Sequence, residues 1–266
     1  MPDEAKGSLP LNDADRRRAE QAFHDRQARE RAGAPSEKTD PLPFDDDRYL
    51  DHESWIRPAF AQLGDLAGSR VLDFGCGHGM AAVVLARRGA QVTAFDVSTG
   101  YLCEAGARAQ ANGVSISFAS GDGVRLPFAD GAFDRIWGNA VLHHVDLRST
   151  APELARVLAP GGVAVFCEPW GENPLLTWAR QRLPYPGKER TPTELPLRQQ
   201  DLTLLRANFA SVEVRGFQLL SMVRRVLDRN RLLAVLEWCD DWFLRRVPRL
   251  QRLCRYVVLT MRPRGP

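Results

Sequence analysis

The stretch VLDFGCGHG, residues 71–79, joins a short apolar run to a glycine-rich turn, and a segment rich in Ala and Val follows it. A strand that enters such a turn and then a helix is typical of ligand-binding α/β folds. Glycine lets the backbone approach a ligand closely, and the helix N-terminus offers unpaired N–H groups. The glycine spacing is GxGxG and Asp73 precedes it. An acidic residue there would repel a pyrophosphate and attract an ammonium group, which favours a ligand with a positive end over a dinucleotide.

Short apolar segments alternate with helix-like segments around this motif. The segments predicted to be strands are 70–74, 91–95, 114–119, 133–139 and 163–167. Helical spacing is found over 80–88, 99–112 and 149–158. Because buried strands that alternate with helices form parallel sheets covered on both faces, the sequence predicts a doubly wound α/β sheet.

The pattern is less regular outside this alternation. Before it, we expect a weakly amphipathic helix over 15–31, a linker over 33–47 and a helix over 51–66. After it, we expect helices near 175–182 and over 201–209 and 223–243, and strands over 212–220 and 255–261. The 266 residues therefore divide into an N-terminal helical extension and linker (1–50), a core (51–170) and a substrate-side insertion with C-terminal strands (171–266).

Composition excludes several classes of protein. With 44% hydrophobic and 26% charged residues, the chain is not wholly disordered. It has no apolar run of about 20 residues, and its N-terminus lacks the apolar core of a secretory signal. Five cysteines without CxxC spacing argue against a disulfide framework and a zinc cluster, so we expect a cytoplasmic protein.

Two further aspartates follow predicted strands. Asp96 comes directly after the second strand, 23 residues after Asp73, and Asp122 lies between two glycines after the third. Ligands bind at the carboxyl ends of strands in doubly wound sheets, where an acidic residue at the position of Asp96 accepts hydrogen bonds from a ribose diol. Asp122 could accept from an adenine amino group. Each aspartate alone could instead cap a turn or helix, but all three together favour a nucleoside-bearing ligand.

Four segments, in this order, resemble class I S-adenosylmethionine-dependent methyltransferases, in particular small-molecule enzymes of a bacterial subgroup. They are VLDFGCGHG (71–79), AFDVS (94–98), GDGVRLPFADGAFDRIWGNAVLHHV (121–145) and LARVLAPGGVAVFCEP (154–169). The resemblance implies a Rossmann-like sheet of seven strands, the last antiparallel, with an N-terminal helical lid and a helical insertion near the C-terminus. It also implies S-adenosylmethionine as methyl donor, S-adenosylhomocysteine as product, and an O, N or C atom of a small metabolite as acceptor.

The same resemblance assigns roles to matching residues. The implied cofactor-binding residues are Asp73, Gly75, Cys76, Gly77, Asp96, Val97, Asp122, Gly123 and Asn139. Asp73 would lie near the methionine ammonium, Asp96 would hold the ribose hydroxyls, and Asp122 would hold the adenine edge. The loop 75–77 would line the methionine with its backbone, and Cys76 would serve there as a small residue rather than as a nucleophile.

Three residues are candidates for removing the acceptor proton. His143 and His144 follow the fourth strand, and Glu168 ends the fifth. Histidine titrates near neutral pH and can act as a general base, although the pair could equally close a loop over the cofactor. Glu168 could be a base, orient an acceptor hydroxyl or cap the following turn. No metal is expected, because no acidic residues lie near the two histidines with the usual ligand spacing.

Acceptor choice is expected to lie with aromatic residues after the core. Trp170 and Trp178 could line an apolar site, and His24 lies on the N-terminal helix that resembles a lid. Residues 174–266 carry 18 basic and 8 acidic side chains. The stretch WFLRRVPRLQRLCRY (242–256) could touch a membrane that holds a lipid-linked acceptor, or be a surface helix with extended Arg stems.

Two other functions stay open. The basic C-terminal region would suit a nucleic-acid methyltransferase, but an NPPY-like acceptor motif is missing after the fourth strand, where the chain reads NAVL (139–142). A binding protein that keeps the cofactor fold without turnover is the other alternative. A natural-product-like acceptor, with at most peripheral membrane contact, remains the first expectation.

Overall fold

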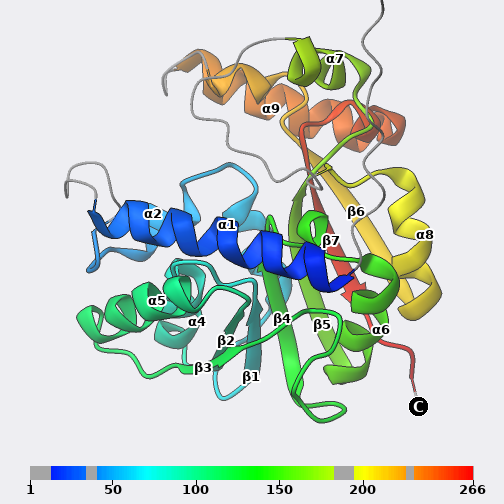
Figure 1. Cartoon of the computed structure of the whole chain (residues 1–266). Helices are drawn as coiled ribbons and strands as arrows, with labels where there is room; N and C mark the ends of the chain where they lie inside the picture. The colour runs from blue at the N-terminus through cyan, green and yellow to red at the C-terminus, as the bar shows by residue number, and fades with distance from the viewer. Residues whose placement is uncertain (1–12, 34–40, 183–194, 226–230, 266) are drawn as a thin grey trace, which may run out of the picture.

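The computed structural model describes residues 13–33, 41–182, 195–225 and 231–265. Within them lies a seven-stranded sheet in the order β3-β2-β1-β4-β5-β7-β6 (Figure 1). Its strands are β1 Arg70–Phe74, β2 Gln91–Asp96, β3 Ser117–Ser120, β4 Phe133–Asn139, β5 Leu158–Pro169, β6 Ser211–Phe217 and β7 Tyr256–Arg262. Strands β1 to β5 are parallel, and β7 is antiparallel to both β5 and β6. The predicted doubly wound sheet with an antiparallel last strand is confirmed.

Helices cover both faces of this sheet. Their bounds are α1 Asp13–Gly33, α2 Asp46–Leu50, α3 Ile56–Phe60, α4 Met80–Arg87, α5 Thr99–Ala111, α6 Leu147–Val157, α7 Pro174–Arg182, α8 Gln199–Asn208 and α9 Arg231–Arg246. Because side chains alternate along a strand, Trp137 packs in the core under α3 and α4, while its neighbour Ile136 packs in the core under α6 and α8. No helix in the described ranges is long and apolar enough to cross a membrane.

Several element boundaries differ from the sequence expectations, including β5, which begins at Leu158 rather than at residue 163, and β3, which begins at Ser117 rather than at residue 114. The helix expected over 51–66 is instead α3 followed by a 3-10 turn. Pro58 would remove a hydrogen bond from a helix that began at Asp51, whereas it is tolerated in the first turn of α3. Strand β6 ends at Phe217, because Gln218 takes a left-handed conformation with φ of 59°. The helix expected over 223–243 is α9 from Arg231, with 226–230 outside the described residues.

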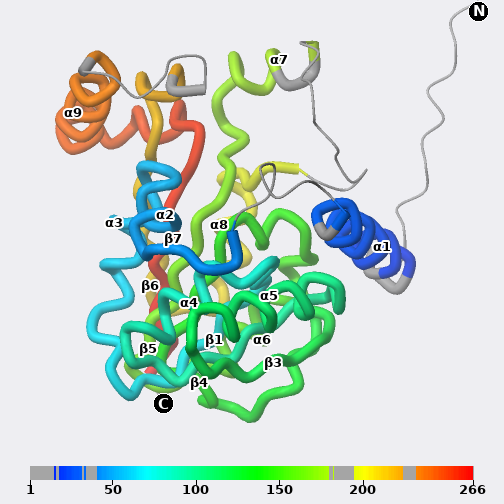
Figure 2. The backbone as a smooth tube through the Cα atoms, turned by 90° about the vertical axis from the view of Figure 1, so that its left-hand side faces the viewer, coloured from blue at the N-terminus to red at the C-terminus, as the bar shows by residue number. Residues whose placement is uncertain are grey.

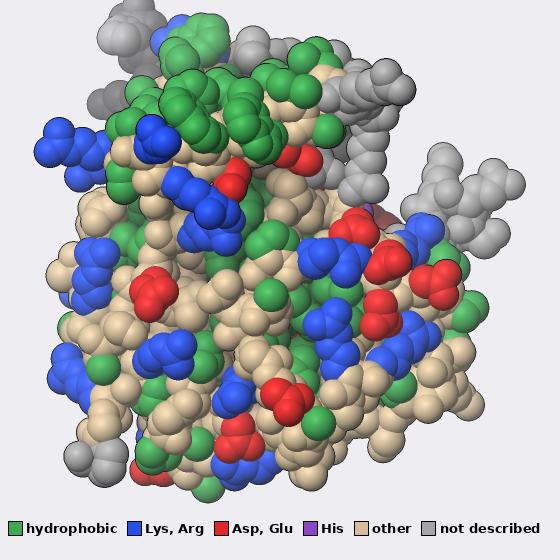
Figure 3. Space-filling view, turned by 180° about the vertical axis from the view of Figure 1, so that it is seen from behind, with side chains coloured by type: hydrophobic (Ala, Val, Ile, Leu, Met, Phe, Trp, Pro, Cys, Tyr) green, Lys and Arg blue, Asp and Glu red, His purple; other side chains and the backbone are tan. Residues whose placement is uncertain are grey.

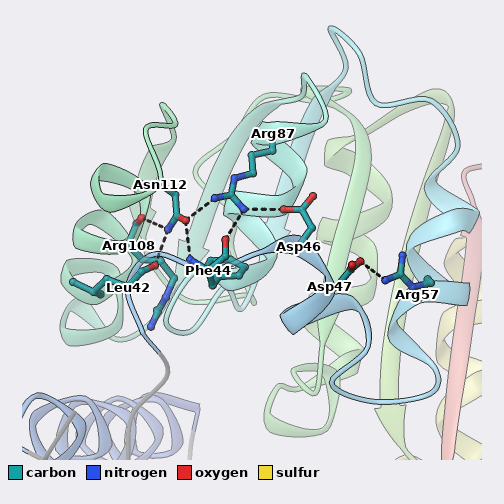
Figure 4. Close-up of polar contacts among 8 residues, drawn as sticks. All are labelled: Leu42, Phe44, Asp46, Asp47, Arg57, Arg87, Arg108 and Asn112. Carbon is teal, nitrogen blue, oxygen red and sulfur yellow. Dashed lines mark hydrogen bonds and ion pairs between the residues drawn. The ribbon is translucent and has the colours of Figure 1, made fainter. Parts of the chain in front are cut away.

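The segment that precedes α2 is fastened to the helices of the core (Figure 4). The guanidinium of Arg87 on α4 donates to the Phe44 carbonyl at 2.8 Å, to Asp46 at 2.9 Å and to Asn112 at 2.7 Å. Asn112 just beyond α5 donates in turn to the Leu42 carbonyl at 2.7 Å. These bonds fix the route of the chain into the core. Residues 34–40 of the expected linker lie outside the described residues.

Helix α1 forms a separate layer beside the sheet. It lies in front of the strands in Figure 1 and to the right of them in Figure 2, and its side chains contact α5. The Asp25 carboxylate accepts a hydrogen bond from the Ser98 hydroxyl at 2.5 Å and one from the Gly100 N–H at 3.3 Å. Arg31 pairs with Glu104 at 3.1 Å. The predicted N-terminal helix is therefore attached to the core by polar contacts more than by an apolar stripe.

Candidate active site

A pocket of about 220 Å³ opens at the carboxyl ends of the parallel strands, under α1. Predicted cofactor-binding residues that line it are Gly75, Gly77, Asp96, Val97, Asp122, Gly123 and Asn139. His144 and His24 line it as well. Because parallel strands end at the same edge of a sheet, residues distant in the chain meet there.

Close approach of two loops explains the glycine motif. Gly75 and Gly77 have φ values of 71° and 50°, in the left-handed region that favours glycine. A Cβ atom on Gly75 would lie 2.3 Å from Cγ2 of Val141, which is impossible without movement. The N–H groups of Gly75 and Cys76 both donate to the Phe95 carbonyl, at 2.8 and 3.0 Å. The loop after β1 is thereby held at the end of β2.

Asp96 holds together the loop that follows β1 and the loop that follows β2. One of its carboxylate oxygens accepts the Gly77 N–H at 2.9 Å, and the other accepts the Ser98 N–H at 2.9 Å. Burial raises the pKa of Asp96, while these backbone N–H groups lower it. A carboxylate oxygen can accept more than one hydrogen bond. Asp96 can therefore hold both loops and still accept from two neighbouring hydroxyls of a ligand.

Asp73 is a buried carboxyl group with one oxygen that lacks a hydrogen bond. It is 2% exposed on β1, and its Oδ2 has no hydrogen-bond partner among the described residues. Burial, together with the charge of Asp96, raises the pKa of Asp73 to about 8. Buried polar atoms without partners are costly, so a cation bound near the glycine loop would compensate both carboxylates. Asp73, on the strand before the loop, and Cys76, within the loop, do not line the pocket.

Apolar side chains complete the pocket opposite these carboxylates. Phe74 and Phe95 stack with centroids 5.8 Å apart and planes at 9°, and both line the pocket with Val97 and Val141. A Cβ atom on Gly123 would lie 2.7 Å from the Phe74 ring. The pocket therefore combines buried acid at one end with flat apolar surface, which fits the ammonium, ribose and adenine of S-adenosylmethionine.

Comparison with known proteins agrees with this geometry. A family model described as "Methyltransferase domain" matches residues 72–166. Methyltransferase GfsG of Streptomyces halstedii is 42% identical over 114 residues, which are 41% of this chain and 41% of that protein. Residues 72–166 of this chain are therefore similar to methyltransferase domains.

A second relative matches this chain over a similar length. Demethylmenaquinone methyltransferase of Beutenbergia cavernae is 38% identical over 126 residues, 44% of this chain and 49% of that one. The matched stretch spans less than half the length of each of these curated relatives.

Two solved structures share the fold over nearly the whole chain. The crystal structure of the [4+2]-cyclase SpnF has 24% sequence identity and a TM-score of 0.56, covering 92% of this chain and 96% of that chain. Geranyl diphosphate C-methyltransferase from Streptomyces coelicolor A3(2), solved with Mg²⁺, geranyl diphosphate and S-adenosyl-L-homocysteine, has 17% identity and a TM-score of 0.57. Its match covers 97% of this chain and 100% of that chain. At these identities the likeness shows the fold alone.

Two of the predicted catalytic residues, Glu168 and His143, lie outside the pocket lining. One oxygen of the fully buried Glu168 accepts the N–H groups of Val141 and Leu142, at 2.9 and 2.7 Å. The other lies 2.7 Å from Nδ1 of His143. Glu168 therefore fastens the loop after β4 to the end of β5, and its carboxylate has no path to an acceptor. Of the three predicted catalytic residues, His144 alone lines the pocket.

The two tryptophans predicted to contact substrate lie away from this pocket. Trp170 is 2% exposed and packs in the core with Leu197 and Leu202. Trp178 is 54% exposed on α7. One ring therefore packs in the core and the other faces solvent, and neither lines the pocket that holds His144.

Several lining residues were not predicted from the sequence. They are Glu20, Phe74, His78, Phe95, Tyr101, Gly121, Ala140, Val141 and Val145. Ala140 follows β4 with φ of 57°, a conformation that non-glycine residues seldom adopt and that is frequent at functional sites. Glu20 could have been predicted to lie near His24, because residues four apart share one face of a helix.

Proposed function

We propose that this chain is an S-adenosylmethionine-dependent methyltransferase that methylates an O, N or C atom of a small, apolar or ring-bearing acceptor. The observation that carries the proposal is the pair of buried carboxylates, Asp73 and Asp96, on either side of the glycine loop. When bound, S-adenosylmethionine supplies a methyl group already activated on a sulfonium, so the protein's work is mainly alignment, worth about 7–11 kcal/mol.

Particular residues would hold the methyl donor. Asp73 would compensate the ammonium, and Asp96 would accept from the ribose hydroxyls. Asp122, whose Oδ1 accepts the Val124 N–H at 3.2 Å, would accept from the adenine amino group, with Val97 and Phe95 against the ring. Asp96, Asp122, Val97 and Phe95 all line the pocket, which supports their roles, and Asp73 would act on the ammonium from behind the glycine loop.

The acceptor side lies between His144 and α1. His24 and Glu20 of α1 line the pocket together with His144, so α1 covers this end and limits access of water. We assign His144 to the removal of the acceptor proton, and His143 and Glu168 to positioning the loop that carries it. This role is supported by the exposure of the His144 ring to the pocket.

Calorimetric titration with S-adenosylmethionine and S-adenosylhomocysteine tests the proposal. Wild-type protein is expected to bind both. Asp96→Ala removes the acceptor of two loop hydrogen bonds and of the ribose contacts, each worth about 1.5–3 kcal/mol, and should weaken binding at least tenfold. Asp130→Ala, at a side chain 82% exposed and outside the pocket, is the control. Failure of the wild type to bind either ligand would contradict the proposal.

Product formation distinguishes a methyltransferase from a binding protein of the same fold. The fold by itself does not decide this, as the cyclase SpnF illustrates. Incubation with labelled donor and a panel of phenols, quinols and amines should give a methylated product. Cofactor binding with no product from the panel would favour the non-catalytic alternative. Transfer to nucleic acid, with affinity falling steeply with salt, would favour the nucleic-acid alternative.

A lipid-linked acceptor is favoured by one surface of the molecule. On α9, Leu232, Val235, Trp238 and Trp242 are 53%, 55%, 68% and 43% exposed. Figure 3 shows hydrophobic side chains gathered at this end, with Lys and Arg beside them. Exposed tryptophans next to arginines suit the surface of an anionic membrane. We propose that α9 rests on such a surface while the pocket receives the acceptor.

A further inference from the structure

Three side chains with metal-binding atoms converge at the acceptor end of the pocket. Glu20 and His24 lie one turn apart on α1, and His144 follows β4. Oε2 of Glu20 lies 3.2 Å from Nδ1 of His144 and 3.5 Å from Nε2 of His24. All three ligand atoms lie within 4.8 Å of one another. The expectation of no metal considered only residues near His143 and His144 in the sequence, and the fold supplies the acid from α1.

These separations match those of a small divalent transition-metal site. Zn–N and Zn–O bonds of about 2.0–2.2 Å in a tetrahedron place neighbouring ligand atoms about 3.3–3.6 Å apart. The two measured separations to Glu20 fall at or beside this range.

The environment of the cluster also suits a metal. The Glu20 side chain is 7% exposed, and burying a carboxylate beside two imidazoles is favourable when a cation neutralises it. His144 Nδ1 is buried and makes no hydrogen bond among the described residues despite its distance from Glu20. The other ring nitrogen of His24 lies 3.4 Å from Oε1 of Gln27. Histidines that bind metals commonly donate from their second nitrogen to such an oxygen.

We propose that Glu20, His24 and His144 bind one divalent transition-metal ion of the Zn²⁺ type. Two imidazoles and one carboxylate suit such an ion better than Mg²⁺, which prefers oxygen ligands. Three protein ligands leave a fourth position open, as in catalytic zinc sites, and all three residues line the pocket. An acceptor hydroxyl bound at that position would release its proton to water more readily, and in the metal-bound protein His144 would act as a ligand rather than take the proton itself. This consequence rests on the proposed function, whereas the site itself does not.

Spectroscopy with Co²⁺ tests the site without reference to activity. Protein treated with chelator and freed of it is titrated with Co²⁺, whose visible absorption intensifies in a tetrahedral site, and with Zn²⁺ by calorimetry. The expected result is one ion per chain at micromolar affinity or tighter. Glu20→Gln and His24→Ala should each weaken binding at least tenfold. Glu30→Gln, exposed on the same helix, and the exposed His52→Ala should not.

Two outcomes would overturn the proposal. One is a wild-type protein that binds neither ion. The other is binding that survives unchanged in both Glu20→Gln and His24→Ala. Circular dichroism and S-adenosylhomocysteine titration of the same samples show whether each variant is folded. They also separate the two proposals, because metal binding without cofactor binding contradicts the methyltransferase, and cofactor binding without metal binding contradicts the metal site.

Discussion

At the scale of single residues, the site depends on acids held in unfavourable surroundings. Asp73 has an unpartnered buried oxygen, and Asp96 uses both of its oxygens to hold loops. A glycine loop by itself would accept many ligands. A buried acid next to it favours a ligand with a positive end, because the positive charge would stabilise the ionised form of Asp73, and burying this acid costs the ligand-free protein stability.

This cost predicts a pH dependence of stability. The folded pKa of Asp73 is about 8, above its unfolded value of about 3.9. Its contribution to stability is therefore fully present below about pH 4 and is lost as pH rises through about 8. Thermal unfolding of the ligand-free protein should show wild type losing stability relative to Asp73→Asn between these values. If the stabilities of the two proteins changed with pH in the same way, the raised pKa of Asp73 would be contradicted.

At the scale of elements, the end of β5 positions the loop after β4. Glu168→Ala would leave the buried N–H groups of Val141 and Leu142 unsatisfied, at about 1–3 kcal/mol each. Urea denaturation should show a loss of about 2–5 kcal/mol, with a lower kcat because His144 moves.

Glu168→Gln is the informative partner of that variant. Its amide oxygen can still accept from Val141 and Leu142, so most of the stability and kcat should return. If Glu168→Gln were as inactive as Glu168→Ala while fully stable, a direct chemical role for the carboxylate would be favoured over positioning.

The attachment of α1 to α5 is a second prediction at this scale. A Cβ atom on Gly100 would lie 2.9 Å from Cβ of Ala28 on α1. Gly100→Leu should therefore displace α1, and trypsin should cleave its arginines at least tenfold faster while the core stays folded. Gly106→Ala on the same helix, where the nearest atom lies 4.0 Å away, is the control. Equal cleavage rates in the two variants would show that α1 does not depend on this contact.

At the scale of the whole molecule, α7 and α9 present apolar surface at one end (Figures 1 and 3). Co-sedimentation with vesicles containing phosphatidylglycerol should capture the protein, and less so at high salt because the arginines contribute charge. Trp238→Ser with Val235→Ser should reduce capture several-fold. Phe118→Ser, on β3 and 39% exposed, should not. Equal capture of both variants would exclude α9 as the contact surface.

Local patterns in the sequence were enough to predict the sheet and much of the pocket lining. Buried strands, glycine turns and acids at strand ends are local patterns, and parallel strands bring their carboxyl ends to one edge whatever the details of packing. This is why Asp96, Asp122 and Gly75 could be placed near one another from their positions in the chain.

The side chains that meet His144, by contrast, could be identified only in the folded structure. Helix α1 has few apolar residues and is held by contacts such as Asp25 with Ser98, so no periodic pattern indicated that Glu20 and His24 would meet His144. Likewise, no local pattern showed whether a carboxylate at the end of a strand would face the pocket or hold a loop. Glu168 holds the loop after β4, through hydrogen bonds from Val141 and Leu142. Both outcomes depend on side chains from elements far apart in the chain, whose packing is determined only when the whole molecule folds.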